Sequence, residues 1–381
     1  MRIPKVFRDV RVLRVLGQVV AVVLLVALVA YLYDNYQANV RQQGFRTGWG
    51  FLDEPTGFDV GNVRFSQPVR DAIWAGVRNT LGSAVVGMVL ATIIGLVVGV
   101  VRLSTSWPAR KAATVYVEIV RNIPVLLIIL FVNTALATLP QIDDARPWGG
   151  VAVWSNREVA VLSTVAGDSF WPYVGLLGVA ALAGLAVAAW RTRVFNATGA
   201  PHHRVLWGGG LLLAAVVIGY LVLDGPITLS RPSGEGRSIT GGAALEVAYV
   251  ALTGALAVYH GSHIAEIVRG SIQAVPHGQT EAASAVGLSN FQRMRYVVLP
   301  QALRIAVPPT INQHLSLAKN TSLGIAVAYS DVASLGSRLI GSSRAPAVQM
   351  VAILMGIYLV ISLTTSLVLN LFNRRVQLVE R

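Results

Sequence analysis

The sequence predicts an all-α integral membrane protein with eight transmembrane helices. Of the 381 residues, 54% are apolar and only 13% are charged, whereas soluble domains carry about 25% charged residues. The mean hydropathy is +0.61. A membrane-spanning helix needs about 20 mostly apolar residues, because its backbone polar groups find no water in the hydrocarbon layer. Eight stretches of the chain meet that requirement.

The predicted spans are distributed along the whole chain. A basic segment precedes the first span, so a cleavable signal peptide is the alternative there. We favour an uncleaved anchor, because the apolar cores of signal peptides run only about 7–15 residues. In the second span Gly95 and Gly99 match the GxxxG pattern of close helix packing, a weak signal in a chain with 36 glycines. The eight spans are 17–33, 79–101, 115–139, 173–190, 206–223, 245–268, 303–329 and 347–371.

The distribution of basic residues predicts the orientation. With the N-terminus in the cytoplasm, the inside segments hold 18 Lys and Arg residues in 88 positions. The outside segments hold 11 in 116 positions. Cytoplasmic loops carry the excess of basic residues, so we expect both termini in the cytoplasm. The net charge of +13 then reflects membrane orientation, and we expect no nucleic-acid partner.

Several chemistries are excluded by composition. The chain has no cysteine, so disulfides and cysteine metal cages are impossible. It has three lysines, Lys5, Lys111 and Lys319, and none follows a glycine, so a phosphate-binding P-loop is absent. No catalytic set of residues stands out. His260 and His263 lie three apart without a third ligand, and we expect no metal site.

The connection after the sixth span carries the most informative local pattern. Thr280 followed by Glu281 favours a helix start, and Gly287 favours a helix stop. A second apolar and basic segment then leads to Leu299 and Pro300, where the seventh span begins. We therefore expect two short helices joined by a glycine bend at the cytoplasmic face. A compact, rigid feature of this kind suits a cleft on a cytoplasmic partner.

The spacing in this connection resembles the signature of the membrane subunits of binding-protein-dependent ABC importers. That signature is Glu-Ala-Ala, three residues, Gly, nine residues, Ile, one residue and Leu-Pro. Val297 stands at the Ile position and keeps a β-branched apolar side chain. An ordinary interhelical loop is the alternative, and the predicted cytoplasmic position favours the resemblance. The six matching residues are Glu281, Ala282, Ala283, Gly287, Leu299 and Pro300.

The resemblance implies that the first short helix is a coupling helix, seated in a groove of an ATPase subunit. Closure of two ATPases would then move the membrane helices as rigid bodies. Gly287 would permit the bend, and Ala282 and Ala283 would allow close backbone approach. Glu281 would either cap the helix or contact the ATPase, and we favour capping.

Four further stretches resemble the polar-amino-acid branch of these permeases. The match covers 72–139 and 244–371, about half of the chain. The resemblance implies a type I importer core of five helices, here the second, third, sixth, seventh and eighth spans. The N-terminal span and a two-helix insertion depart from that core. This enlarged form resembles one membrane subunit of the broad-specificity L-amino-acid importers. The four stretches are 118–126, 264–270, 299–309 and 319–323.

These comparisons predict the organisation of the chain. We expect the aromatic residues of the outer loop, among them Trp49 and Phe51, to lie at headgroup depth, with a docking surface for an external partner as the alternative. The predicted parts are the cytoplasmic N-terminus and first span (1–33), a periplasmic loop (34–71), the first part of the permease core (72–139), the two-helix insertion (140–243), the second part of the core with the cytoplasmic coupling loop 274–300 (244–371), and a cytoplasmic tail (372–381).

Two acid–base pairs lie near the predicted cytoplasmic side. Glu118 precedes Arg121 by three residues, and Glu266 precedes Arg269 by three. Residues three apart share a helix face, so each pair can form a local ion pair. We expect structural anchoring from both pairs rather than contact with a substrate.

The seventh span is unusually polar for a membrane segment. Lys319 lies deep within it unless the helix ends early, and a buried ammonium is a functional hypothesis. Pro308 and Pro309 are expected to bend or interrupt the helix. An amino acid needs a donor-rich and an acceptor-rich end in its site. We therefore expect a translocation pathway or gate here, with dimer packing as the alternative. The candidate residues are Asn312, Gln313, Lys319, Asn320, Thr321 and Ser322.

The resemblance implies an ATP-driven importer that moves L-amino acids, of broad or polar specificity, across the bacterial cytoplasmic membrane by alternating access. The implied partners are a second, different permease chain, two ABC ATPase subunits and a periplasmic amino-acid-binding protein, together with membrane lipid. ATP and Mg would be used by the ATPases, and this chain would be no enzyme and hold no cofactor. An ion- or proton-coupled secondary carrier is one alternative, disfavoured because Glu118 and Glu266 are paired with arginines. A non-transporting scaffold that recruits an ATPase is the other.

Overall fold

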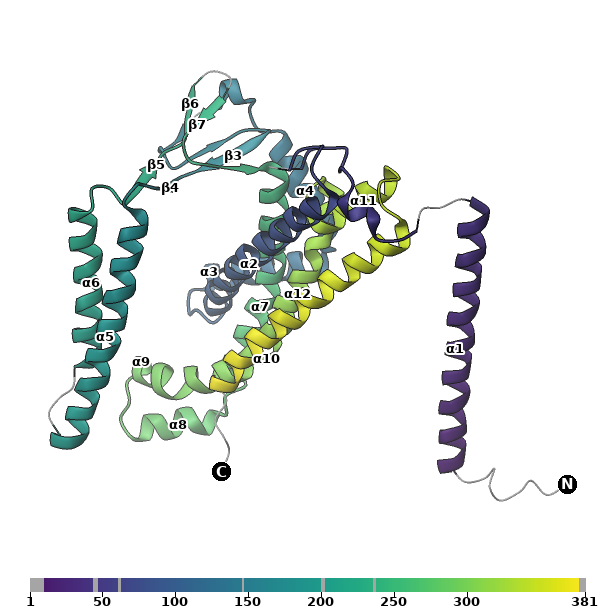
Figure 1. Cartoon of the computed structure of the whole chain (residues 1–381). Coiled ribbons are helices and arrows are strands. Elements are labelled where there is room, and N and C mark those ends of the chain that lie inside the picture. Colours follow the sequence, from purple (N-terminus) through teal and green to yellow (C-terminus); the bar gives the residue numbers. More distant parts are fainter. Residues whose placement is uncertain are drawn as a thin grey trace. The chain divides into compact units, whose positions relative to one another are not determined.

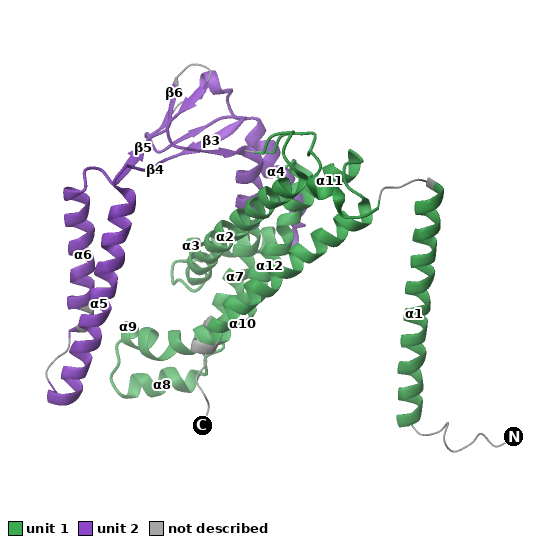
Figure 2. Cartoon of the chain, viewed as in Figure 1, with its two compact units in different colours: residues 1–121, 256–381 green, residues 122–255 purple. Residues whose placement is uncertain are grey.

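Two compact units make up the chain. The computed structural model describes residues 10–43, 47–60, 63–145, 147–199, 203–235 and 238–376. One unit comprises residues 1–121 and 256–381, and the other comprises residues 122–255 (Figure 2). The predicted insertion, 140–243, lies inside the second unit, whose limits are wider on both sides.

The first unit is almost wholly helical. Short helical turns complete it, namely η2 (Gly50–Asp53), the π-helical turn η4 (Met294–Val298) and the 3-10 turn η5 (Thr321–Val327). Its helices, labelled in Figure 1, are α1 (Val10–Gln43), α2 (Val69–Val101), α3 (Trp107–Asn122), α7 (Val247–Gln273), which begins in the second unit, α8 (His277–Ala285), α9 (Asn290–Arg293), α10 (Leu299–Asn320), α11 (Val332–Gly341) and α12 (Ala347–Val376).

Four described helices are long and apolar enough to cross a membrane: α1, α2, α12 and α5 (Phe170–Thr198). Two broken pairs pass the same test, namely α3 with α4 (Val125–Ala137), and the helical run Asn290–Val327 with α11. The described part of the chain therefore has up to six candidate spans. The predicted count of eight is not reached, because α6 (Arg204–Val222) is short and α7 is too rich in polar residues to pass.

The predicted third span, 115–139, is broken into two helices. α3 ends at Asn122 and α4 begins at Val125. Pro124 lies between them, has no backbone N–H, and disfavours helical geometry at the residue before it. The helix therefore ends before this proline and a new helix begins after it.

The predicted seventh span, 303–329, is interrupted at a different place from the one expected. α10 runs through Pro308 and Pro309 without a break, so these prolines do not interrupt the helix, and a bend at them stays a prediction. The helix ends early, at Asn320, and η5 follows. Ala328, with a φ of +56°, closes η5, and the axis turns by 45° before α11. Lys319 therefore lies in the last turn of α10.

The prediction of an all-α fold is wrong in the second unit. Residues expected to form two outer loops contain eight short strands instead. β2 (Ala152–Trp154) and β3 (Glu158–Val161) form a hairpin whose valines alternate with other residues, a pattern typical of strands. Pairing of β3 with β8 (Ala243–Glu246) joins segments far apart in the sequence, for example Val159 opposite Leu245. Such long-range pairing leaves little local signal for β8, and the other strands are only two to four residues long.

Three antiparallel sheets result from these strands. The largest has the order β1-β2-β3-β8, with β1 at Pro147–Trp148. The second pairs β4 (Ser163–Ala166) with β5 (Ile227–Ser230), and the third pairs β6 (Ser233–Glu235) with β7 (Ser238–Thr240). Between β4 and β5 the chain forms the α5–α6 hairpin. Its helices touch through bare backbone, because a Cβ at Gly184 would lie 2.9 Å from the Gly208 carbonyl oxygen.

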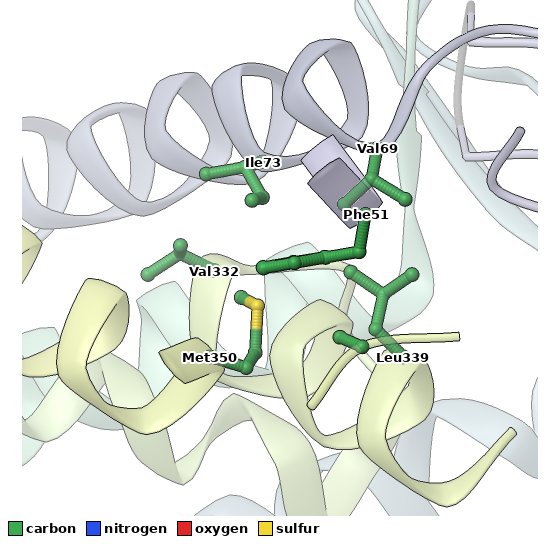
Figure 3. Packing of buried hydrophobic residues seen from close by; sticks show 7 residues of the cluster. Phe51, Val69, Ile73, Val332, Leu339 and Met350 are labelled. Atoms are coloured by element: carbon green, nitrogen blue, oxygen red, sulfur yellow. The ribbon is translucent and has the colours of Figure 1, made fainter. Parts of the chain in front are cut away.

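The outer loop of the first unit folds onto the helices. Figure 3 shows Phe51 among side chains of α2, α11 and α12. Phe51 is 3% exposed and therefore packs against protein, whereas Trp49 is 57% exposed. The buried residues of this cluster are Phe51, Val69, Ile73, Val332, Leu339, Ala345 and Met350.

The GxxxG pattern of α2 is used in packing. A Cβ at Gly95 would overlap the side chain of Ile264 on α7. A Cβ at Gly99 would lie 2.8 Å from the backbone oxygen of Ala265 and 2.8 Å from the Val268 Cβ. Small residues allow helix backbones to approach closely in a membrane, where the hydrophobic effect gives no drive between helices. The weak sequence signal thus marks a real contact between α2 and α7.

We expect Gly99→Ala to destabilise the protein by about 1–3 kcal/mol, because an added methyl group would press on backbone that cannot move aside. The check is the midpoint of thermal unfolding in detergent. Gly82→Ala is the matched control: Gly82 lies on the same helix with nothing within 4 Å of a Cβ, and alanine favours helix by up to about 1 kcal/mol. Equal midpoints for the two variants would contradict close packing at Gly99.

Candidate functional site

α8 ends in a defined C-terminal motif at Gly287. The Gly287 N–H donates to the Ser284 carbonyl at 2.9 Å, and the Leu288 N–H donates to the Ala283 carbonyl at 3.1 Å. This pair of bonds is the Schellman motif, which places the residue after the cap in the left-handed region. Gly287 has a φ of +84°, a conformation that glycine adopts without strain. The predicted helix stop therefore has a specific backbone cause.

A capping box starts α9 two residues later. Ser289 Oγ accepts the Gln292 N–H at 3.4 Å, and Gln292 Oε1 accepts the Ser289 N–H at 2.9 Å. η4 follows and leads into α10 at Leu299 and Pro300. Because Pro300 has no N–H, it cannot donate to the preceding turn, and the wider π turn lies directly before it.

Side chains hold the two short helices together. Arg293 donates to Ser284 Oγ at 2.9 Å, and Gln301 donates to Gln279 Oε1 at 3.3 Å. A small buried cluster lies next to these helices. We call residues 277–298 the cytoplasmic knob, because the sequence predicts that they lie on the cytoplasmic side of the membrane. The cluster consists of Val275, Val298 and Ala302, with Ile272 packed against it.

The structure differs from the sequence prediction at the start of the knob. α8 begins at His277, one turn before Thr280, so Glu281 does not lie at the N-terminus and does not cap the helix. Glu281 instead pairs with His277, Oε1 to Nδ1, at 2.9 Å. Pro276 precedes the helix, and proline at this point predicts an earlier start than Thr280 does.

The residues of the signature occupy both faces of the knob. Ala283 is buried against the helices, while Glu281, Ala282, Gly287 and Leu299 are exposed. Pro300 is half-buried.

Sequence reasoning missed three large apolar side chains on the same knob. Val286 is 81% exposed, Phe291 70% and Tyr296 64%. Val286 lies outside every candidate membrane span, whereas Phe291 and Tyr296 lie at the start of the broken pair that begins at Asn290. Exposed apolar groups that gather on a rigid feature indicate a contact with another molecule. Their only sequence signal was apolar character within a basic loop.

One glutamate, Glu266, forms ion pairs with three arginines that lie near the ends of α2, α3 and α7. Glu266 forms ion pairs with Arg102 and Arg269, and Arg121 lies 3.8 Å from its Oε2. Arg102 comes from the end of α2 and has a side chain only 9% exposed. Glu118 lies one turn before Arg121 on α3 and is exposed. The Glu266–Arg269 pair is thus part of a network that joins three helices.

A polar seam links α7 to α10. His260 Nδ1 lies 3.1 Å from Gln313 Oε1, and Asn320 Nδ2 lies 3.2 Å from His260 Nε2. A carbonyl oxygen only accepts and an amide nitrogen only donates, so both contacts are satisfied by a neutral imidazole protonated on Nδ1. His260 is buried. The structure therefore brings together two predicted pathway residues through a histidine that sequence reasoning considered only as a metal ligand.

The other predicted pathway residues of α10 lie elsewhere. Asn312 and Lys319 are exposed, and Ser316 between them is exposed on the same face, since the three are spaced by four and three residues. Thr321 is buried and donates to the Ala318 carbonyl at 2.8 Å, while Ser322 donates to the Lys319 carbonyl at 2.8 Å. α10 thus has one polar face inside the unit and another on its surface.

Two amino-acid transport permeases are similar to this chain over nearly its whole length. The general L-amino acid transport system permease protein AapQ of Rhizobium johnstonii is 38% identical over 370 residues, 96% of this chain and 92% of that protein. The glutamate/glutamine/aspartate/asparagine transport system permease protein BztB of Rhodobacter capsulatus is 34% identical over 416 positions, covering 100% of this chain and 97% of that protein. A crystal structure of an amino acid ABC transporter with histidines matches 80% of this chain and 94% of its own, with a TM-score of 0.48 and 19% identity.

Residues 205–378 also match the family described as binding-protein-dependent transport system inner membrane component. That range includes the cytoplasmic knob and the α10 segment. Identity of 38% over nearly the full length shows kinship, so this chain belongs to that family and is the permease component of an amino-acid ABC transporter in a bacterial inner membrane.

Proposed function

We propose that the chain forms the translocation pathway of an ATP-driven importer of L-amino acids and that partner ATPases move it through the cytoplasmic knob. The observation that carries this proposal is the exposure of Val286, Phe291 and Tyr296 on a feature fixed by a Schellman motif and a capping box. Exposed aromatic anchors on a rigid support are typical of interfaces between proteins. The knob continues directly into α10, so a push on it reaches the membrane helices as rigid-body movement.

The surface face of α10 supports a pathway. Asn312, Ser316 and Lys319 are exposed in the single chain. Lipid is a poor surrounding for an ammonium and an amide, because neither finds a hydrogen-bond partner in hydrocarbon. These side chains therefore face either a water-filled passage or a second permease chain. A passage with amide, hydroxyl and ammonium groups offers partners to both ends of an amino acid.

Contacts within the first unit agree with the proposed orientation. Arg102 and Glu266, both near predicted inside segments, pair with each other. At the opposite end of α2, Thr80 Oγ1 accepts the Val332 N–H at 3.1 Å, and Arg344 donates to the Pro55 carbonyl at 3.4 Å. Segments proposed to share a side of the membrane thus contact each other, while the excess of basic residues is what favours cytoplasmic termini.

The proposed assembly has two permease chains, two ABC ATPases and a periplasmic amino-acid-binding protein. AapQ is named for a general L-amino acid transport system, which supports a broad range of substrates. ATP and Mg would be used in the ATPases, and transport would proceed by alternating access. The six parts proposed from the sequence remain the working division of the chain, with the insertion at 140–243.

The deciding experiment is uptake of L-glutamine into proteoliposomes that hold the purified complex. We expect uptake only with ATP on the side of the ATPases and with the binding protein present. An ion- or proton-coupled carrier would instead take up glutamine along an imposed ion gradient without ATP. A scaffold would bind the ATPase and move nothing, so either result would overturn the proposal.

Phe291→Ser should weaken ATPase binding by roughly 30-fold, because loss of a buried aromatic anchor costs about 2 kcal/mol at an interface. The measurement is the amount of ATPase that co-purifies at graded concentrations. Phe65→Ser is the matched control, since Phe65 is equally apolar and 62% exposed but lies in the outer loop. Unchanged co-purification for Phe291→Ser would remove the knob from the coupling role.

Asn312→Leu should lower ATP-driven uptake at least tenfold while ATPase co-purification stays normal, because the substitution removes a polar group from the proposed passage. Thr364→Leu, an exposed polar-to-apolar change on α12, should leave uptake within twofold. The amount of the second permease chain recovered in the same purification distinguishes two roles for Asn312: a place in the passage, or contact with that second chain. Loss of that chain together with uptake would favour packing, and normal uptake would exclude both roles.

A further inference from the structure

A small polar pocket opens in the second unit between the 3-10 turn η3 (Ile142–Asp144) and the turn that joins β2 to β3. Its volume is about 390 Å³. This lies near the lower end of small-molecule sites, about 300–1,000 Å³, so the pocket suits one small molecule. None of its residues belongs to the knob or to the proposed passage. The lining residues are Gln141, Ile142, Asp143, Asn156 and Arg157.

The frame of the pocket is held by hydrogen bonds. Ser155 is fully buried, and its Oγ donates to the Glu158 carbonyl at 2.7 Å and accepts the Glu158 N–H at 3.1 Å. The Asn156 N–H donates to the Pro140 carbonyl at 3.0 Å and so ties the turn to the segment before η3. These bonds fix the backbone of the turn that carries Asn156 and Arg157. A buried apolar cluster in the same sheet region consists of Ala145, Val153 and Ala160.

The pocket presents both signs of charge. Asp143 lines it from η3 and Arg157 from the β2–β3 turn, and both are exposed. Within the described ranges neither takes part in an ion pair. A simple anion would be repelled by Asp143 and a simple cation by Arg157. A molecule that carries an ammonium and a carboxylate meets both side chains favourably, because a guanidinium fork matches a carboxylate.

Asn156 adds an unused acceptor to the same pocket. Its Oδ1 is buried and has no hydrogen-bond partner in the described part of the chain. Rotation of this amide toward the pocket breaks no bond at that oxygen and offers an acceptor to a bound N–H group. An ammonium has three such donors.

We infer that this pocket is a second binding site for a free L-amino acid, separate from the proposed passage. Arg157 binds the carboxylate, and Asp143 with Asn156 binds the ammonium. Because Asp143 and Arg157 are exposed to solvent, the site is weak. In the proposed orientation the site lies on the outer side of the membrane, from which the substrate arrives. Its occupancy therefore follows the external amino-acid concentration.

The test is a saturation-transfer NMR titration of L-glutamine against the full chain in nanodiscs, without ATPase or binding protein. We expect Asp143→Asn and Arg157→Gln each to raise the dissociation constant at least fivefold. Asp144→Asn and Arg231→Gln are the matched controls, since Asp144 is the next residue and Arg231 is an exposed arginine of the same unit, and neither lines the pocket. Both controls should stay within twofold of the unchanged chain.

Two analogues assign the ends of the ligand. N-acetyl-L-glutamine lacks the ammonium and should bind the unchanged chain and Asp143→Asn equally weakly. L-glutaminamide lacks the carboxylate, so it should bind the unchanged chain and Arg157→Gln equally weakly. The inference is overturned if the unchanged chain does not bind glutamine, or if the pocket variants bind it as tightly as the unchanged chain does. It is also overturned if the control variants lose as much affinity as the pocket variants. Because the titration needs no transport, such a result leaves the proposed importer intact.

Discussion

A glycine-lined face of α2 determines how the first unit packs. Gly76 lies against Val332 of α11, Gly87 against Leu317 of α10, and Gly95 and Gly99 against α7. In a bilayer the tails of lipids are as apolar as leucine, so helices associate through close contact and hydrogen bonds. α2 supplies that contact to three helices in turn. The polar seam, the arginine network and the start of α11 all depend on these approaches.

The polar groups of the core follow from the same constraint. Buried donors and acceptors in a low-dielectric interior must find partners within the protein. The His260 ring forms hydrogen bonds with both Gln313 and Asn320. Asp331 caps α11 through one carboxylate oxygen, and its Oδ2 accepts a hydrogen bond from the Tyr358 hydroxyl at 3.1 Å. These bonds tie helices into blocks that shift together. A block that continues into the knob, as α10 does, is a suitable receiver for movement generated by a partner.

The sequence revealed the elements whose cause is local. Gly287 predicted a helix stop and the long apolar runs predicted several spans, because backbone geometry and burial in lipid act on neighbouring residues. Features that depend on distant segments were missed. β3 pairs with β8 across more than eighty residues, α11 is amphipathic within a predicted loop, and Phe51 is buried by helices far along the chain. The exposure of Phe291 and the position of His260 between two amides likewise follow only from three-dimensional packing.

The antiparallel pairing of β3 with β8 has a consequence for the α5–α6 hairpin that lies between them in the sequence. Glu158 lies opposite Glu246 and Val161 opposite Ala243, so the backbone leaves and rejoins the main sheet on adjacent strands, about 4.8 Å apart. The segment between β3 and β8 carries the α5–α6 hairpin, and its two ends lie side by side in that sheet. Domain insertions are tolerated where the two ends meet in this way. Changes in the length of the α5–α6 hairpin therefore leave the pairing of β3 with β8 in register.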